Sequence, residues 1–131
     1  MRLFAVVLSV WTSCAQNLPV DHVDAHCDLR VGMEPRGYCQ EWRSLLDAPG
    51  SDVTALGVCA ALGTEYVETT CVDEEDIIAG CFIGTLGDGS ESYWWFYSVD
   101  EDGNDVTEAD VRSECDDGSF VVWSPSETLM R

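Results

Sequence analysis

Two apolar runs in the middle of the chain, separated by a turn sequence, predict a β-hairpin. Residues 77–86 are rich in apolar and β-branched side chains, and "ESYWWFYS" at 91–98 follows them. Between the two runs lies "GDGS" at 87–90, a typical turn sequence because glycine adopts backbone angles that other residues avoid. We therefore expect two antiparallel strands joined by this turn.

Two short helices are predicted on either side of the hairpin. The apolar residues of "SDVTALGVCAALG" at 51–63 recur every three or four positions, and Gly63 is placed to end that helix. Farther on, Thr107 is followed by Asp110, which has the form of a capping box. That pair predicts a second helix over "EADVRSEC", residues 108–115.

The segment "GYCQEWRSLLDAPG" is predicted to form a third helix. Cys39, Trp42, Leu45 and Leu46 are spaced for one helical face, and "APG" follows as a stop. Alternation in "TEYVETTC" at 64–71 predicts a strand, and "SFVVWSP" predicts a closing strand that Pro125 ends. The fold class expected from these elements is α+β, with a small antiparallel sheet and short helices packed on one face.

The first residues have the features of an export signal. Arg2 precedes the apolar run "LFAVVLSVW", which is too short to span a bilayer, and the small residues of "TSCAQ" come next. We expect a signal peptide over 1–15 that is cleaved, or a lipobox that ends at Cys14 and makes it a lipid anchor. The expected divisions are then an N-terminal arm and short helix over 16–50, a disulfide-tied domain over 51–124, and a loose tail over 125–131.

Cysteine content agrees with export to an oxidising compartment. Six cysteines follow the signal, an even number that predicts three disulfides and hence an extracytoplasmic protein, secreted or anchored to the cell envelope. No CxxC pair is present, which argues against a zinc site. The expected pairs are Cys27 with Cys39, Cys59 with Cys71, and Cys81 with Cys115, although geometry could exchange these partners.

Charge narrows the choice of partners. The chain carries 25 acidic residues against six arginines and no lysine, for a formal net charge of −19. The electrostatic field of such a negatively charged protein repels nucleic acid and anionic membrane surfaces. The absence of lysine also excludes Schiff-base chemistry and the lysine of a phosphate-binding loop.

Residues 53–123 resemble a module found in small exported or lipid-anchored bacterial proteins. The shared pattern consists of "CAALGTEYVETTC", "AGC", "YWWFY", "TEADVRSEC" and "GSFV". The resemblance implies an extracytoplasmic location and a disulfide-tied α+β structure. It implies no activity, because that group has no assigned one.

The aromatic strand is the main candidate for a binding surface. Alternation sends its rings to opposite faces, with Tyr93, Trp95 and Tyr97 on one and Trp94 and Phe96 on the other. Exposed rows of tryptophan and tyrosine suit sugar rings or peptides. The alternative is that both faces are covered and the strand is part of the core.

Two acidic segments invite a metal interpretation. Asp100, Asp102 and Asn104 match the first positions of a calcium loop, but Asp105 stands where that loop requires glycine, so only a distorted calcium site, with Asp105 as a further ligand, is conceivable. His22 and His26 lie four residues apart among acids, yet the glutamate of a zinc protease motif is absent. No cofactor other than calcium is suggested, and a solvated loop and ordinary histidines are the competing interpretations.

Two functions of different class follow. The favoured one is a non-catalytic exported module that binds an envelope glycan, peptide or protein through the aromatic strand. The alternative is a secreted hydrolase or metal-dependent enzyme that uses the histidines and acidic loops, but no GxSxG motif supports a serine nucleophile.

Overall fold

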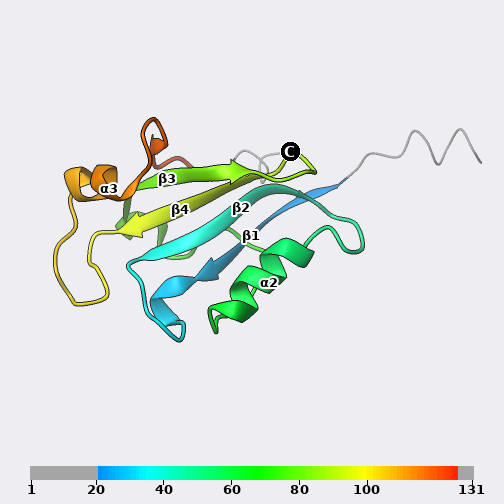
Figure 1. Cartoon of the computed structure of the whole chain (residues 1–131), viewed down its shortest axis with the longest axis horizontal. Coiled ribbons are helices and arrows are strands. Elements are labelled where there is room, and N and C mark those ends of the chain that lie inside the picture. The colour runs from blue at the N-terminus through cyan, green and yellow to red at the C-terminus, as the bar shows by residue number, and fades with distance from the viewer. Residues whose placement is uncertain (1–20, 127–131) are drawn as a thin grey trace, which may run out of the picture.

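The computed structural model describes residues 21–126 and contains one five-stranded antiparallel sheet. The strand order is β1-β2-β4-β3-β5, and Figure 1 shows the first four strands side by side. The strands are β1 (His22–Asp28), β2 (Tyr38–Leu46), β3 (Ile77–Thr85), β4 (Glu91–Tyr97) and β5 (Phe120–Val122). The remaining elements are α2 (Val53–Ala61), α3 (Glu108–Glu114) and the single turns η1 (Leu29–Val31) and η2 (Glu74–Asp76). The expected α+β class is confirmed.

Local sequence signals gave the hairpin and both helices correctly. β3 pairs with β4 around the turn at 87–90, where Gly89 has a φ of 88°. Asp88 fixes this turn because its carboxylate accepts hydrogen bonds from the backbone N–H groups of Ser90 and Leu46. At the start of α3, Thr107 Oγ1 and the Asp110 carboxylate each accept the other residue's backbone N–H, so the capping box is present.

The helix predicted within residues 37–50 is wrong, because Tyr38–Leu46 of this segment is strand β2. Ser44 has a φ of 62° and lies at a β-bulge, where one residue of β1 faces two of β2. The extra residue changes the spacing of Trp42 and Leu45 from two positions to three while keeping both in the same core cluster. Their spacing therefore imitates a helix.

The strand predicted over residues 64–71 is also wrong, apart from one bridge between Val67 and His26. The expected N-terminal arm is instead ordered into β1 from His22 onward, paired along β2. The signal segment, Cys14 and residues 127–131 lie outside the described residues. No helix in the described part of the chain is long and apolar enough to cross a membrane.

Both helices cover one face of the sheet, here called the helix face. Its core joins Ala55 and Cys59 of α2 and Val111 of α3 to strand residues that include Trp42 and Phe96. The opposite face, here called the second face, carries a smaller core cluster of Cys39, Cys71, Ile77, Trp95 and Tyr97. The irregular segment 64–76 contributes Cys71 to that cluster and therefore covers part of the second face.

Three disulfides tie these layers together, but only one of the expected pairs is right. The bonds join Cys27 to Cys59, Cys39 to Cys71 and Cys81 to Cys115. Cys27 and Cys39 cannot pair because the first belongs to the core of the helix face and the second to that of the second face. In the chain-entropy model, loops of this length contribute about 3–4 kcal/mol each.

Candidate functional site

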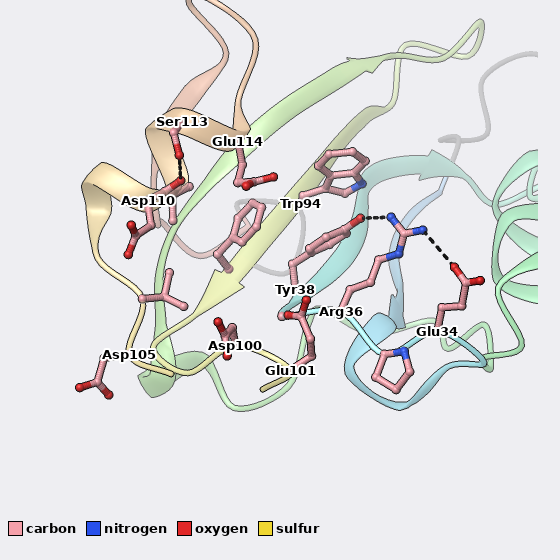
Figure 2. Close-up of a pocket in the computed structure, with 15 residues that line it drawn as sticks. Glu34, Arg36, Tyr38, Trp94, Asp100, Glu101, Asp105, Asp110, Ser113 and Glu114 are labelled. Carbon is pink, nitrogen blue, oxygen red and sulfur yellow. Dashed lines mark hydrogen bonds and ion pairs between the residues drawn. The ribbon is translucent and has the colours of Figure 1, made fainter. Parts of the chain in front are cut away.

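An open groove of about 760 Å³ lies on the helix face, between the start of β2 and α3. Its floor consists of Tyr38, Trp94 and Phe96, whose rings are in contact: the centroid of Tyr38 is 4.8 Å from that of Trp94 and 5.0 Å from that of Phe96. Figure 2 shows these rings with polar side chains around them. We call this site the acidic groove.

The rim of the acidic groove comes from three segments that are separate in sequence. The loop before β2 supplies one carboxylate, the loop between β4 and α3 supplies three, and α3 supplies two. These six residues are Glu34, Asp100, Glu101, Asp105, Asp110 and Glu114. One basic side chain, Arg36, lines the groove with them. Part of the chain's large negative charge is therefore gathered around this groove.

Arg36 marks one end of the groove. Its guanidinium donates a 3.1 Å hydrogen bond to the hydroxyl oxygen of Tyr38 and lies 3.9 Å from the carboxylate of Glu34. The hydrogen bond to Tyr38 raises the pKa of Arg36 above its ordinary value, so this group remains a cation. Figure 2 shows Arg36 extended beside the Tyr38 ring.

A glycine brings the acidic wall close to the floor. A Cβ atom at Gly37 would lie 3.1 Å from Asp100 Cα and 3.2 Å from a carboxylate oxygen of Glu101. The wall is itself ordered, because the side chain of Asp100 accepts hydrogen bonds from the backbone N–H groups of Asp102 and Asn104. The geometry of the rim is thus set by the backbone as well as by side chains.

The indole nitrogen of Trp94 lacks a partner in this site. Trp94 Nε1 is buried and meets no hydrogen-bond acceptor among residues 21–126. Leaving such a donor unpaired costs about 1–3 kcal/mol. An acceptor that reached this nitrogen after a shift of the side chains that cover it would recover this free energy.

The structure separates the five aromatics of β4 as alternation predicted. Trp94 and Phe96 lie on the helix face, while Trp95 and Tyr97 belong to the core of the second face and are 1% and 2% exposed. Tyr93 is half-buried and stacks on Trp95 with their centroids 5.1 Å apart. Two of the five candidate residues therefore reach the groove.

The candidate metal residues are not gathered into one site. His22 is exposed, whereas His26 is buried and its Nδ1 lies 2.8 Å from the carbonyl oxygen of Thr69. Asp100 and Asp105 line the groove, but Asp102 and Asn104 do not. No group of three or more His, Cys, Asp or Glu side chains within 21–126 is arranged to hold a metal ion. A calcium site in this loop stays a prediction from sequence.

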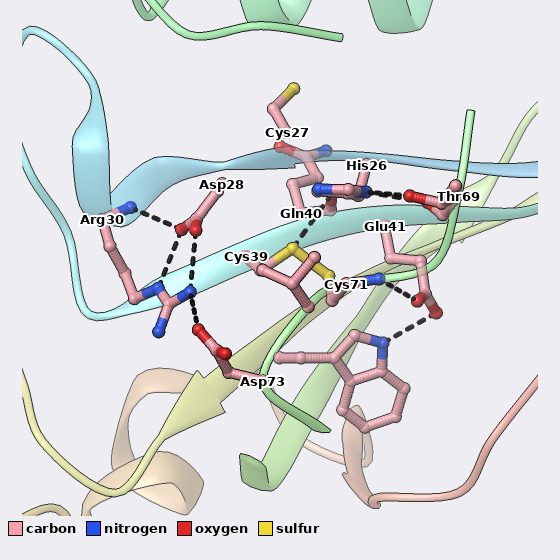
Figure 3. Close-up of a disulfide and its surroundings, with 12 residues drawn as sticks. His26, Cys27, Asp28, Arg30, Cys39, Gln40, Glu41, Thr69, Cys71 and Asp73 are labelled. Atoms are coloured by element: carbon pink, nitrogen blue, oxygen red, sulfur yellow. Dashed lines mark hydrogen bonds and ion pairs between the residues drawn. A yellow bond between two sulfur atoms is a disulfide. The ribbon is translucent and has the colours of Figure 1, made fainter. Parts of the chain in front are cut away.

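The second face is closed by a polar network around the Cys39–Cys71 disulfide (Figure 3). The fully buried carboxylate of Glu41 accepts hydrogen bonds from Cys71 N, Trp95 Nε1 and the guanidinium of Arg43. Three donors satisfy a charge that would otherwise be costly to bury. This network fastens the covering segment to the sheet.

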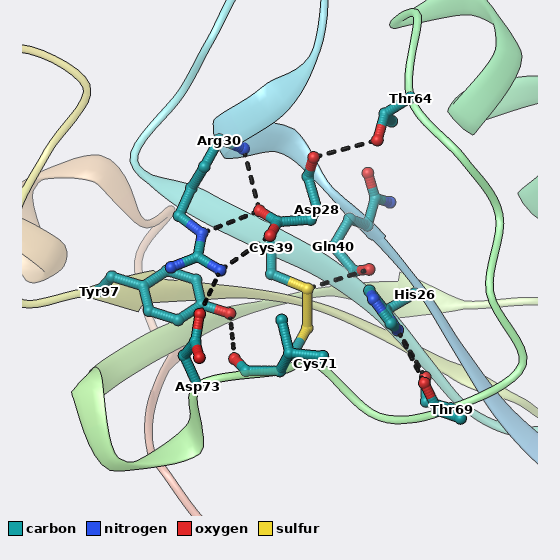
Figure 4. A network of polar contacts seen from close by, with 11 residues as sticks. His26, Asp28, Arg30, Cys39, Gln40, Thr64, Thr69, Cys71, Asp73 and Tyr97 are labelled. Carbon is teal, nitrogen blue, oxygen red and sulfur yellow. Dashed lines mark hydrogen bonds and ion pairs between the residues drawn. A yellow bond between two sulfur atoms is a disulfide. The ribbon is translucent and has the colours of Figure 1, made fainter.

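A second group of contacts fastens the same segment through Arg30, as Figure 4 shows. Arg30 forms ion pairs with Asp28 at 2.8 Å and Asp73 at 2.9 Å, and its guanidinium lies 3.7 Å from the centroid of the Tyr97 ring. Burial opposes ionisation of Asp28, but the hydrogen bonds from Arg30 outweigh it and hold the pKa of that carboxyl below its usual range. The pKa of Tyr97, in contrast, is raised, because burial disfavours its ionised form. Its hydroxyl donates a hydrogen bond to the carbonyl of Val72.

Sequence reasoning missed the groove residues at the start of β2 and in the loop before it. Tyr38 was assigned to a helix, and no signal connected Arg36 or Glu34 to the aromatic strand. The pairing of Tyr38 with Phe96 across β2 and β4 brings them together, and such long-range pairing leaves no local trace.

No family model, curated protein or solved structure matches this chain. Its function must therefore be argued from the groove itself.

Proposed function

We propose that the protein is an exported, non-catalytic binding module, and that an envelope glycan, peptide or protein binds in the acidic groove. The observation that carries the proposal is the aromatic floor of Tyr38, Trp94 and Phe96 in an open groove. Aromatic rings offer a ligand a large contact area at low cost in side-chain entropy. The volume also lies within the usual range of ligand sites, about 300–1,000 Å³.

The frame around the groove supports the same proposal. α3 forms one wall, and the Cys81–Cys115 disulfide ties the end of this helix to β3. The three disulfides are compatible with an extracellular module. A rigid frame lowers the entropy cost of binding because few groups must be ordered when the ligand arrives.

Retention of envelope components on the immobilised, oxidised protein tests the proposal. We expect Trp94→Phe to lower retention, since a phenyl ring offers the ligand a smaller surface than the indole does. Trp123→Phe is the matched control, because Trp123 packs against Trp95 on the second face. Circular dichroism and thermal unfolding establish that both variants fold.

Equal retention by the two variants would contradict the groove as the binding site. A loss of retention on chelation of divalent metals would instead favour the metal-dependent alternative. Separate glycan and protein fractions of the envelope identify which class of ligand is retained.

A further inference from the structure

The distribution of cations over aromatic rings singles out the floor of the acidic groove. Three of the four arginines within 21–126 lie over rings: Arg30 over Tyr97, Arg112 over Phe120, and Arg43 over a group that includes Trp95. The fourth, Arg36, bonds to the hydroxyl of Tyr38 and does not lie over its ring face. The Tyr38–Trp94–Phe96 group is thus the contacting aromatic group in the described chain that has no cation over it.

Charge at the rim favours a cation in the same place. Six carboxylates and one arginine line the groove, and Glu101, Asp105 and Glu114 form no ion pair with any described residue. Carboxylates gathered around one groove repel one another. A bound cation relieves this repulsion and gains contact with the ring faces.

The unpaired Trp94 Nε1 indicates the kind of molecule that carries the cation. An ammonium or guanidinium group has only donors and cannot satisfy an indole N–H. A peptide supplies carbonyl oxygens next to its basic side chains, and it can do both once the side chains that cover this buried nitrogen shift.

We propose that the acidic groove binds a lysine- or arginine-bearing segment of a partner protein, with a basic side chain over Tyr38 and Trp94 and its charge among the rim carboxylates. This inference rests on the proposed function and names the ligand class of that site. Binding is steered by charge, so it weakens as ionic strength rises.

Calorimetric titration with a capped peptide of alternating alanine and arginine tests the inference. The citrulline counterpart keeps the shape and removes the charge, and spermidine supplies charge without a peptide backbone. We expect the arginine peptide to bind at least tenfold more tightly than either probe. Equal binding of the citrulline peptide, equal binding of spermidine, or no binding of the arginine peptide would each overturn the inference.

Two double variants locate the binding. Glu101→Gln with Glu114→Gln removes two rim charges, and Asp102→Asn with Glu108→Gln removes two charges from the same loop and helix outside the groove. We expect the first pair to lower peptide affinity about fivefold or more and the second less than twofold, since exposed ion pairs are worth about 0.2–1 kcal/mol each. Equal losses would show that the overall charge of the protein attracts the peptide, and the inference would fail.

The two proposals fail in different ways. If the peptide does not bind while Trp94→Phe still lowers retention of a glycan fraction, the cationic ligand is wrong and the binding module stands. If neither binding of the peptide nor retention of any envelope fraction changes in Trp94→Phe, both proposals are wrong.

Discussion

The indole Nε1 of Trp95 donates a 3.0 Å hydrogen bond to the carboxylate of Glu41, and both side chains are buried. Neighbouring Cys71 and Arg43 supply the other donors to this carboxylate. A single acidic side chain thus joins two strands, the covering segment and a disulfide at the centre of the second face.

Replacing Glu41 by alanine is expected to destabilise the protein by about 3–5 kcal/mol, because it leaves a largely buried arginine without its counter-charge. Urea unfolding of the oxidised protein measures this loss. Glu41→Gln keeps an acceptor for Trp95 and should cost less than alanine. A loss below about 1 kcal/mol for alanine would show that the network contributes little.

The ion pair of Asp28 with Arg30 predicts a pH-dependent stability. The folded-state pKa of Asp28 is held below the ordinary value of 3.8, so the native state binds this proton more weakly than the unfolded state does. The stabilisation is therefore complete above that value and is lost as the pH falls from there through the native pKa.

Asp28→Asn is expected to cost about 1–2 kcal/mol near pH 7, and the difference from the unmodified protein should shrink below pH 3.8. Urea unfolding at a series of pH values gives this comparison. Asp117→Asn, at an exposed carboxyl, is the control and should change little. A difference in the free energy of unfolding that stays constant down to the lowest pH of the series would contradict the role of the ion pair.

Gly37→Ala is expected to push the acidic wall away from the floor, since its Cβ would meet Asp100 Cα at 3.1 Å. We expect a loss of about 1–3 kcal/mol in stability and weaker binding of the arginine peptide. Gly57→Ala is the matched control, because a Cβ there has open space and alanine stabilises a helix by up to about 1 kcal/mol. Unaltered peptide affinity in Gly37→Ala would show that the wall position is unimportant.

Peptide mapping of the oxidised protein checks the cysteine pairs. Digestion at acidic residues separates all six cysteines, and mass spectrometry should find Cys27 linked to Cys59 and Cys39 linked to Cys71. Removing the Cys39–Cys71 pair with two alanines should cost about 3–4 kcal/mol in the chain-entropy model. A fragment linking Cys27 to Cys39 would contradict the arrangement of the two faces.

Elements with local signals could be predicted from the sequence, and elements defined by distant pairing could not. The capping box of Thr107 and the turn at 87–90 each lie within a few residues, so they were found. Strand β2 was missed because residues on both of its faces, such as Trp42 and Glu41, are buried and the bulge at Ser44 disturbs the period. A strand buried on both sides loses the alternation that identifies strands.

The candidate site was predicted in part for the same reason. Trp94 and Phe96 could be assigned to one face because alternation along a single strand is a local property. Tyr38 and Arg36 reach the groove only through the pairing of β2 with β4. The disulfide partners of Cys27 and Cys39 were predicted wrongly for the same reason. The face of the sheet on which Cys39 lies depends on the register between β2 and β4.

The order of the disulfides along the chain divides the protein into two covalent halves. Cys27–Cys59 and Cys39–Cys71 interleave and close before Cys81–Cys115 begins. Residues 72–76 lie between the halves and are exposed. A single proteolytic cut there would leave two fragments with no disulfide between them, held together only by strand pairing and side-chain packing, even though all three disulfides remained intact.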